Sequence, residues 1–366
     1  MTKSQFLLIL TGLAFLACQP RTEEHRPTIQ YVRDVLADNS GPVYSLLSQY
    51  AEADRKGDIV IIGTEEQCFA LGTQFTTCDL SDNVDASAGG DGLPDFGGEF
   101  IATITDDAST PYSGFIDRGD ADGLREAVVR SVICAIDTTY SLTAYDVECQ
   151  GRKEAAKMVI LADVHQQVYG KFDVDTLLNS TGCGIDVVTA LSAMLDRALG
   201  NTEKREINLG IICPAGTEDL TLYQTAVSEL LPGRKPNCFA SPADASDTTN
   251  VLVSFLDRYI AAGNTAPLDA VIVDDYAVLQ SDLDEGLRRA SSLMSAESLT
   301  YAKYLADGIR VECPAEAVSA TCFKLMRERN IFTHKISRPQ LLPFKTVGRQ
   351  DEGRMLLTPL SFYVQD

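Results

Sequence analysis

The sequence predicts an α/β protein with mainly parallel sheets, helices on both faces of those sheets, and two lobes. Continuous apolar runs rich in β-branched residues, such as residues 58–63, are typical of strands that are buried on both faces. Each such run is followed by polar residues and then by a helical pattern, which favours right-handed βαβ crossovers. The chain has 366 residues, enough for two lobes of ordinary domain size.

The expected elements follow the chain in order. Two short helices are predicted within residues 28–53, and they are split by the turn-forming residues 38–42. Buried strands are predicted at residues 58–63, 100–105, 157–162, 207–212 and 268–273. Helices are predicted near residues 121–136, 185–198, 219–231, 244–262, 282–294 and 315–329, with Asp219 and Asp244 as N-caps.

The composition also suggests how the chain is divided. We expect a first α/β lobe with the N-terminal helices at residues 28–150 and a second α/β lobe at residues 151–335. Residues 81–98, rich in Gly, Asp and Ala, are predicted to be a long loop that is either a lid or disordered. Residues 336–366 are predicted to be extended chain that adds an edge strand and packs on the body.

The charge excludes some classes of partner. The formal net charge is −21, while 45% of the residues are hydrophobic and 23% are charged, as in a packed globular protein. Such an acidic body repels phosphate backbones and anionic lipid surfaces, so nucleic acid is not an expected partner. The charge weakly favours cationic or neutral ligands.

The N-terminus has the pattern of an export signal. Lys3 supplies a positive charge, residues 6–16 form an apolar segment shorter than the ~20 residues needed to span a bilayer, and a small residue precedes Cys18. This pattern resembles the signal of bacterial lipoproteins, which implies cleavage of residues 1–17 and acylation of Cys18, for example by palmitate. A plain secretory signal and an uncleaved anchor are the alternatives.

The resemblance implies a location. Residues 18–27 are polar and bounded by proline, which predicts a lipidated tether between membrane and body. The protein would then belong to the bacterial cell envelope, anchored by lipid to a membrane and facing the periplasm or the exterior.

The ten cysteines suit an oxidising compartment. Without Cys18 their number is odd, so at least one thiol stays unpaired unless a bridge joins two chains. The spacing suggests four disulfide bonds, although the connectivity stays open: Cys68–Cys78, Cys134–Cys149, Cys213–Cys238 and Cys313–Cys322, with Cys183 left over.

Polar residues directly after the predicted strands are the candidate ligand-binding residues, because ligands of open α/β sheets bind beyond the carboxyl ends of the strands. These residues are Glu66, Gln67, Asp163, His165, Asp274 and Tyr276. If the strands are parallel, these side chains converge on one rim. The alternative is that they cap helices, as polar residues do in every α/β protein.

His165 is the sharpest of these candidates, since His25 lies in the expected tether and His334 is the only other histidine. With Asp163 it would form an acid/base pair if the strand continues to residue 165, because residues two apart on a strand share a face. A solvent-facing or structurally bonded histidine is the alternative. Asp274 and Asp275 would suit a cation or a ligand amine.

Residues 180–184 contain two glycines and are predicted to open a helix at Ile185. Backbone N–H groups at that helix start could approach an anion, and Cys183 would be a candidate nucleophile there; a plain small-residue turn is the alternative. The spacing fits neither a Walker loop nor a dinucleotide fingerprint. No motif in the chain indicates a cofactor or a metal, and no residue is assigned a catalytic role.

In the order of its elements, the body resembles periplasmic solute-binding proteins of type I over residues 57–335, with residues 268–279 as the best local match. That resemblance implies two lobes that close on a small ligand at the strand ends. We therefore expect a membrane-tethered periplasmic protein that binds a small-molecule solute, with a membrane transporter or another envelope protein as partner. The alternatives are a periplasmic hydrolase that uses His165 with a carboxylate or Cys183, and a non-catalytic surface interaction lipoprotein.

Overall fold

The computed structural model describes residues 26–50, 54–85, 87–105, 111–143, 149–200, 202–217, 219–244, 250–292, 298–333, 335, 337–349 and 354–360. The expected signal peptide, Cys18, most of the tether, His25 and His334 lie outside these residues. No helix within the described ranges combines the length and the apolar character needed to cross a membrane.

The larger sheet has six strands in the order β12-β11-β2-β1-β5-β6. Their bounds are β1 Asp58–Gly63, β2 Phe100–Thr105, β5 Ala156–Leu161, β6 Asp186–Thr189, β11 Gln340–Arg349 and β12 Arg354–Pro359. All neighbours are parallel except the antiparallel pair β11 and β12. Every residue of β1 and β5 is buried, which confirms the prediction of strands covered on both faces.

The smaller sheet has four parallel strands in the order β10-β9-β7-β8. Their bounds are β7 Glu206–Cys213, β8 Lys235–Pro242, β9 Leu268–Val273 and β10 Leu305–Glu312. A short antiparallel ribbon of β3 (Thr139–Tyr140) and β4 (Gly151–Arg152) lies beside the larger sheet and contacts it through β12. The predicted α/β class with two mainly parallel sheets is confirmed.

Helices cover both faces of both sheets. One face of the larger sheet packs against α1 (Gln30–Ala37), α2 (Pro42–Ser48), α5 (Ala121–Ile136) and α6 (Lys171–Thr181), and its other face packs against α3 (Glu65–Thr77). The outer face of the smaller sheet packs against α9 (Val251–Ala261) and α10 (Gln280–Ser291). Shorter helical pieces are α4 (Tyr112–Asp117), the π-helix η1 (Gln166–Gly170), α11 (Ser298–Tyr301) and η3 (Ala302–Tyr304).

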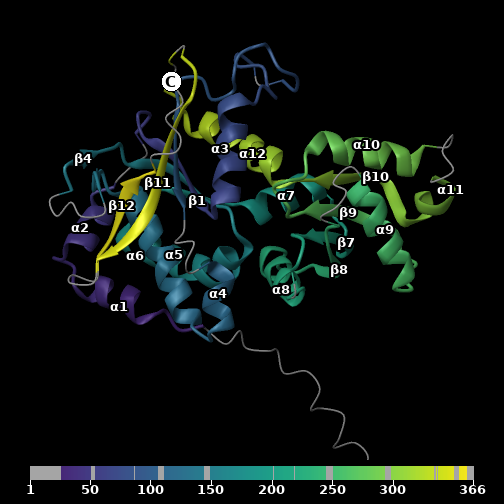
Figure 1. The fold of residues 1–366 in the computed structure, drawn as a ribbon, viewed down its shortest axis with the longest axis horizontal. Helices are drawn as coiled ribbons and strands as arrows, with labels where there is room; N and C mark the ends of the chain where they lie inside the picture. Colours follow the sequence, from purple (N-terminus) through teal and green to yellow (C-terminus); the bar gives the residue numbers. More distant parts are fainter. Residues whose placement is uncertain are drawn as a thin grey trace, which may run out of the picture.

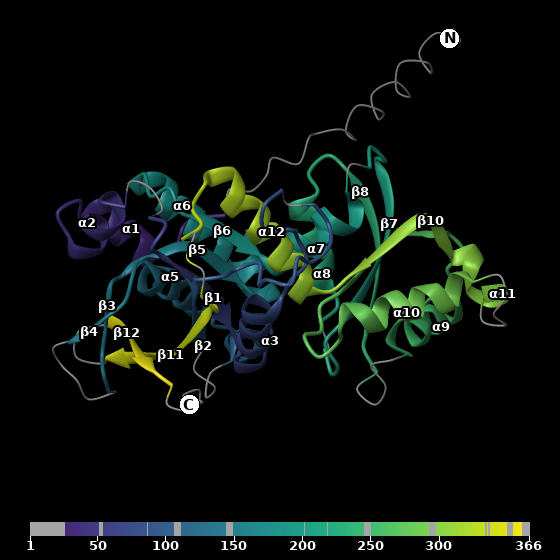
Figure 2. The same ribbon diagram turned by 90° about the horizontal axis from the view of Figure 1, so that it is seen from above.

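The two lobes lie end to end, with α7 (Ala190–Leu199), α8 (Thr221–Leu230) and α12 (Pro314–Arg329) between them (Figures 1 and 2). One hydrophobic core runs through this region and includes Ile61 and Ile160 of the larger sheet together with Leu209 and Ile272 of the smaller one. Helix α7 contacts β6 as well as β9 and β10. The lobes are therefore joined by continuous apolar packing.

The segment 185–198, predicted as one helix, forms strand β6 followed by α7. The four residues Asp186–Thr189 pair in parallel with β5, as the β-branched residues Val187, Val188 and Thr189 favour. Thr189 then begins α7 as its N-cap and accepts a hydrogen bond from the backbone N–H of Ser192 at 3.3 Å. The helical periodicity of residues 190–199 concealed the short strand before it.

Pairing decides which sheet a strand joins, and it does not follow a division at residue 150. Strands β5 and β6 lie in the larger sheet, because β5 pairs with the central strand β1. At the C-terminus, β11 lies inside that sheet between β2 and β12, so the edge strand is β12.

Helix α9 begins after Asn250, so Asp244 is not its N-cap. Asp219 precedes the N-cap Leu220 of α8 and accepts hydrogen bonds from the backbone and hydroxyl of Thr221.

Carboxylates hold the described part of the 81–98 segment. Asp95 accepts hydrogen bonds from the backbone N–H groups of Leu80 at 3.0 Å and Ser81 at 3.2 Å. Asp79 accepts from the N–H groups of Asp91 and Gly92, each at 2.9 Å. The aspartates of this segment thus satisfy the backbone of the loop in which they lie.

The expected disulfide bonds are wrong: the cysteines from Cys68 to Cys322 are thiols. Cys68 lies in the first turn of α3 and Cys78 directly follows the last residue of that helix. A helix rises about 1.5 Å per residue, so their Cα atoms are about 15 Å apart, whereas a bridge needs them within ~7 Å. Cys313 and Cys322 are separated in the same way along α12.

The other two pairs are not bonded either. In the register of β7 and β8, Cys213 lies opposite Pro242 and Cys238 lies opposite Leu209, which separates the two cysteines by about 13 Å along the strands. The thiol of Cys134 contacts the backbone oxygen of Met355 at 3.4 Å, while that of Cys149 contacts Ser141 Oγ at 3.6 Å. The positions of the cysteines along the chain therefore did not correctly predict whether their thiols form disulfide bonds.

Candidate functional site

Each sheet has a point at which successive strands are added on opposite sides. In the larger sheet β2 lies on one side of β1 and β5 on the other, and in the smaller sheet β8 and β9 flank β7 in the same way. At such a switch point the connections leave on opposite faces, which opens a crevice beyond the carboxyl ends of the strands. We define the strand-end cluster as the polar side chains at these two points: Gln67, Asp163, His165, Tyr223, Asp274 and Tyr276.

Gln67 is oriented by the start of α3. Thr64 is the N-cap of that helix, and its hydroxyl accepts a hydrogen bond from the backbone N–H of Gln67 at 3.3 Å. In return Gln67 Oε1 accepts a hydrogen bond from the backbone N–H of Thr64 at 2.9 Å, which completes a capping box. The amide nitrogen of Gln67 is left to donate to Asp163 Oδ2 at 2.9 Å. The capping box thus directs the amide nitrogen of Gln67, just after β1, towards Asp163, just after β5.

Asp163 and His165 form a pair at the end of β5. Asp163 Oδ1 accepts hydrogen bonds from the backbone N–H of His165 at 2.8 Å and contacts Nδ1 of its ring at 2.7 Å. Strand β5 ends at Leu161, so the expected strand extension to residue 165 is wrong. The pair forms instead because the chain turns sharply after the strand and the Asp163 side chain bonds the backbone two residues on. Since Nδ1 faces Asp163, the other ring nitrogen, Nε2, points away from it.

The charges of this pair support each other. Burial disfavours ionisation of Asp163, but the hydrogen bonds and charge of His165, together with Gln67, outweigh it and keep the pKa of Asp163 below its usual value. Burial likewise lowers the pKa of His165, and Asp163 more than restores it, so that the pKa of His165 is raised. The side chains are 13% and 21% exposed, respectively, so solvent reaches the pair.

Asp274 occupies the matching place in the smaller sheet. It directly follows β9, and its backbone N–H donates to the oxygen of Ile212 in β7 at 2.8 Å. Tyr223, on α8, donates its hydroxyl to Asp274 Oδ2 at 2.7 Å. Burial raises the pKa of Asp274 to about 7; the bond from Tyr223 opposes this shift, and the charge of Asp163 adds to it.

The two halves of the cluster meet across the lobe boundary. The hydroxyl of Tyr276, two residues after Asp274, donates to the backbone oxygen of Ala162 at the end of β5 at 2.7 Å. The charge of Asp274 contributes to the raised pKa of His165, and the charge of Asp163 contributes to that of Asp274. The strand ends of both sheets therefore form one electrostatic unit.

A π-helix carries one side of the cluster. The residues after His165 form η1, and π-helical turns occur frequently at functional sites. Gln166, at its start, accepts a hydrogen bond from the backbone N–H of Asp163 at 3.1 Å and donates to the hydroxyl of Tyr112 at 2.8 Å. The buried amide of Gln166 thus locks the turn that presents Asp163 and His165.

Five of the six predicted ligand-binding residues lie in this cluster: Gln67, Asp163, His165, Asp274 and Tyr276. Glu66 does not: it is exposed in the first turn of α3, because the side chain of its neighbour Gln67 takes the inward direction. The sequence reasoning also missed two features. The Thr64 to Gln67 spacing is a readable capping-box signal, whereas Tyr223 lies in an ordinary helical pattern that gives no sign of its contact with Asp274.

The prediction for residues 180–184 is wrong. Gly182 ends α6 in the left-handed conformation, with φ of 71°, and the chain then enters β6 rather than a helix. Residues 180–184 therefore provide no helix start for an anion. Burial raises the pKa of the Cys183 thiol, which works against a thiolate nucleophile there.

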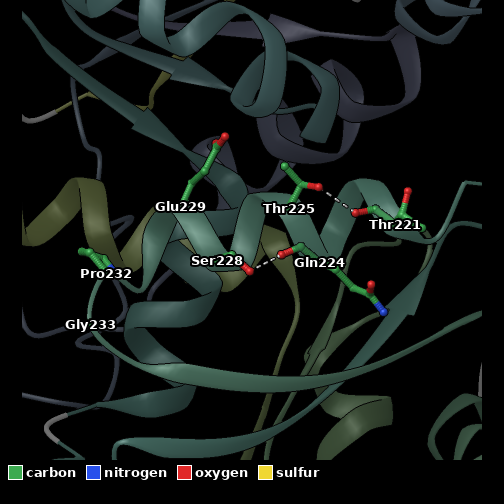
Figure 3. Close-up of a pocket in the computed structure, with 7 residues that line it drawn as sticks. All are labelled: Thr221, Gln224, Thr225, Ser228, Glu229, Pro232 and Gly233. Carbon is green, nitrogen blue, oxygen red and sulfur yellow. Dashed lines mark hydrogen bonds between the residues drawn. The ribbon is translucent and has the colours of Figure 1, made fainter. Parts of the chain in front are cut away.

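Two surface hollows lie elsewhere, on the smaller lobe. One, of about 620 Å³, lies along α8 and Pro232–Gly233 (Figure 3). Its hydroxyl groups on Thr225 and Ser228 are used within the helix, since they donate to the backbone oxygens of Thr221 at 3.1 Å and Gln224 at 2.8 Å. The other, of about 600 Å³, lies between β8 and the end of α9. No residue of the strand-end cluster lines either hollow, because Tyr223 lies on the buried side of α8.

The described residues contain no group of three or more His, Cys, Asp or Glu side chains arranged to hold a metal ion. The strand-end cluster instead offers carboxylate, imidazole, phenol and amide groups, with no lysine or arginine among its six members. Such a set accepts hydrogen bonds from, and attracts, a cationic group.

Comparison with known proteins gives a distant likeness in structure alone. Neither a protein-family model nor a curated protein matches the sequence. Among solved structures, the chain is similar to glutamate racemase isoform RacE1 from Bacillus anthracis, with a TM-score of 0.48 and 14% identity over 81% of this chain and 90% of that one. It is also similar to the glutamate racemase of Francisella tularensis, solved with D-glutamate. The TM-score is 0.45 and the sequence identity is 14%, over 81% of this chain and 90% of that one. For the glutamate racemase of Thermus thermophilus the TM-score is 0.43 and the sequence identity is 13%, over 82% of this chain and 91% of that one. These values carry over no residue role and no activity.

Proposed function

We propose that the protein binds a small solute with a cationic group, such as an amine, at the strand-end cluster. The observation that carries the proposal is the pair of carboxylates at the meeting strand ends, where burial and, to a smaller extent, the charge of Asp163 raise the pKa of Asp274. A cation bound beside these carboxylates would favour the ionised form of Asp274. His165 and the phenol of Tyr276 would add hydrogen-bonding groups at the rim.

The fold limits how binding takes place. The expected resemblance to solute-binding proteins implied lobes that close on a ligand, but continuous apolar core joins these lobes. The ligand would therefore enter a largely preformed site, with rearrangement confined to side chains and the loops after β5 and β9.

Thermal unfolding of the full-length protein tests this proposal. The ligand panel contains amino acids and simple amines, sugars, nucleosides and divalent metal salts, at pH 5 and pH 8. A ligand at 100 times its dissociation constant adds about 2.7 kcal/mol, which raises the melting temperature by a few degrees. We expect shifts from amine-bearing ligands, larger at pH 8 because Asp274 is then ionised.

Variants define the site. Asp163→Asn and Asp274→Asn should each abolish the shift, whereas Asp117→Asn, which changes an exposed carboxylate on α4, should retain it. A shift that survives in both cluster variants, or that arises only from anions, would overturn the assignment.

A second candidate, a hydrolase, is favoured by one observation: Asp163 holds Nδ1 of His165 at 2.7 Å and directs Nε2 away, which is the arrangement of a general base with its orienting carboxylate. The test is hydrolysis of a panel of chromogenic esters and amides. This candidate requires turnover that His165→Asn abolishes while thermal unfolding stays cooperative. Absence of turnover across the panel, or turnover that survives in the variant, counts against it.

We also propose that the protein is a lipid-anchored component of the bacterial cell envelope, facing the periplasm or the exterior, with a transporter or another envelope protein as partner. The support is the pattern of the first 18 residues. In a bacterial host, labelled palmitate should be incorporated into the wild-type chain and not into Cys18→Ser. Equal labelling of both, or of neither, would contradict the lipidation.

A further inference from the structure

The first described residues of the chain dock on the helical segment that carries the site. Arg26 donates a hydrogen bond from Nη1 to the backbone oxygen of Val168, inside the π-helix η1, at 2.9 Å. Its guanidinium also lies 5.7 Å from the ring centroid of Tyr169. Residue 26 belongs to the segment predicted as a lipidated tether, and the structure places it against the body.

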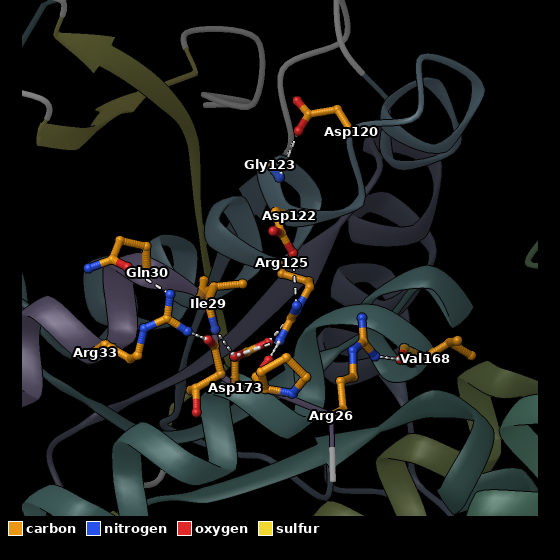
Figure 4. A network of polar contacts seen from close by, with 12 residues as sticks. Arg26, Ile29, Gln30, Arg33, Asp120, Asp122, Gly123, Arg125, Val168 and Asp173 are labelled. Atoms are coloured by element: carbon orange, nitrogen blue, oxygen red, sulfur yellow. Dashed lines mark hydrogen bonds and ion pairs between the residues drawn. The ribbon is translucent and has the colours of Figure 1, made fainter. Parts of the chain in front are cut away.

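A buried ion pair holds the next residues of this segment (Figure 4). Asp173 is fully buried and forms an ion pair with Arg125 at 2.6 Å. The same carboxylate accepts the backbone N–H of Ile29 at 3.0 Å, and Arg125 donates to the backbone oxygen of Pro27 at 2.7 Å. Residues 26–29 are thereby held at both ends: Arg26 is bonded to η1, and Ile29 is bonded to the first turn of α6.

The other end of η1 is the strand-end cluster. His165 directly precedes the π-helix, and its ring lies nearly parallel to that of Tyr169, at an interplanar angle of 14° and a centroid distance of 6.5 Å. Arg26 and His165 therefore both lie beside the ring of Tyr169. A π-helix has wider, less stable turns than an α-helix and needs outside support to persist, since tertiary contacts override the local preference.

We propose that Arg26 is a positioning residue for the site: by holding Val168 and Tyr169, it maintains the π-helical turn and thus the geometry of the His165–Asp163 pair. The inference rests on the proposed function only in treating the strand-end cluster as the ligand site. It ties the place where the N-terminal segment meets the body to the geometry of that site, so that displacement of this segment would alter His165.

The pKa of His165 is the readout, because the two ways in which Arg26 could act change it in opposite directions. Loss of positioning weakens the contact with Asp163, which lowers the pKa of His165. Loss of the positive charge alone would raise it. The carboxylates of Asp163, Asp274 and Asp219 each act to raise the pKa of the His165 ring.

The experiment is an NMR titration of the histidine side chains in the full-length protein without ligand, with the His165 signal assigned by its loss in His165→Asn. In Arg26→Met we expect the pKa of His165 to fall by about 0.5 units or more. In Arg26→Lys, which keeps a donor and the charge, most of the fall should be reversed. Arg33→Met is the matched control, since Arg33 bonds within its own segment to Thr28 and Gln30, and it should leave the pKa unchanged.

A rise of the pKa in Arg26→Met would show a through-space charge effect, and no change would show that Arg26 does not position the pair; either result overturns the inference. If Arg26→Met does not fold, Tyr169→Leu removes the ring that both residues contact and should lower the pKa of His165 in the same way. Because no ligand is present, these outcomes are independent of whether the cluster binds an amine.

Discussion

The hydroxyl of Tyr223 donates a 2.7 Å hydrogen bond to Oδ2 of Asp274, and both side chains are buried. The bond connects α8 to the end of β9, at the point where the smaller sheet faces the strand ends of the larger one. Because the hydroxyl stabilises the ionised carboxylate while burial disfavours it, the pKa of Asp274 lies at about 7. Tyr223 therefore offsets part of the effect of burial on the charge of the proposed site near neutral pH.

Tyr223→Phe should raise the pKa of Asp274 above about 7, since it removes the donor that favours the carboxylate. The measurement is a carboxyl-carbon NMR titration of the wild type and the variant. Tyr259→Phe serves as the control, because the hydroxyl of Tyr259 bonds to the backbone oxygen of Ala266 instead. An unchanged or lowered pKa in Tyr223→Phe would refute the role given to this hydroxyl.

Asp58→Asn should stabilise the protein at alkaline pH. Asp58 is 1% exposed, its Oδ2 has no hydrogen-bond partner among the described residues, and burial raises its pKa to about 7. A carboxyl group whose pKa is raised on folding contributes stability that is fully present below its unfolded pKa and is lost as the pH rises through its folded pKa, here between about 4 and 7. The Asp58→Asn variant has no carboxyl group at this position, so it does not lose this stability as the pH rises.

Denaturant unfolding at pH 4.5 and pH 8 measures the effect of Asp58→Asn. The stability of the variant relative to the wild type should increase between these pH values, by an amount on the order of 4 kcal/mol at most. Asp274 titrates over the same range in both proteins, so its contribution cancels. The exposed change Asp117→Asn should give no such increase, and a variant that loses stability with pH as the wild type does would contradict the prediction.

Lys157→Met should destabilise the protein by about 3–5 kcal/mol, because it leaves Glu99 as an uncompensated buried charge. Lys157 forms an ion pair with Glu99, both side chains are 0% exposed, and Lys157 also donates to the backbone oxygens of Arg55 and Ile331, each at 3.0 Å. The pair joins β5 to the segment that precedes β2 and to the end of α12.

The double variant Lys157→Met/Glu99→Leu should lose less stability than Lys157→Met, since it removes both charges. Lys171→Met is the comparison at the surface: its partner Asp175 is 46% exposed, so the cost should be about 1 kcal/mol or less. Urea unfolding gives all three values. Equal losses for Lys157→Met and Lys171→Met would show that the buried pair is not a significant part of the stability.

A reducing agent should leave the melting temperature unchanged, because the cysteines from Cys68 to Cys322 are thiols. Alkylation of the denatured, unreduced protein followed by mass spectrometry should modify all of them. Protection of any pair from alkylation, with a lower melting temperature after reduction, would show a disulfide bond and overturn the geometry described for these residues.

Much of the fold is predictable from the chain because buried strands and amphipathic helices have distinct local patterns. The strand at 58–63 and the helix at 121–136 have the predicted bounds, and Asp120 begins that helix by accepting the backbone N–H of Gly123 at 2.9 Å. Strand β6 was concealed because its four residues lead directly into α7. A short strand is recognised by its pairing partner, which lies far along the chain.

The candidate site divides in the same way. Asp163, His165 and Asp274 were predicted by their places after buried strands, since parallel strands bring their carboxyl ends to one edge. Tyr223 was not, because its bond to Asp274 joins residues 51 positions apart in the chain. The Asp163–His165 contact was expected from a strand and arises from a turn, so the two side chains do meet but the predicted backbone geometry was wrong.

By itself the sequence determined the α/β class, most of the buried strands and the residues at their carboxyl ends, because these follow from local patterns of apolar and polar side chains. Only the tertiary structure decided the strand order, the shared core between the lobes, the free state of the thiols it holds apart, and the docking of Arg26 on η1. Each of these depends on which distant segments pack together, and packing is settled by the whole set of competing contacts rather than by any single stretch of chain.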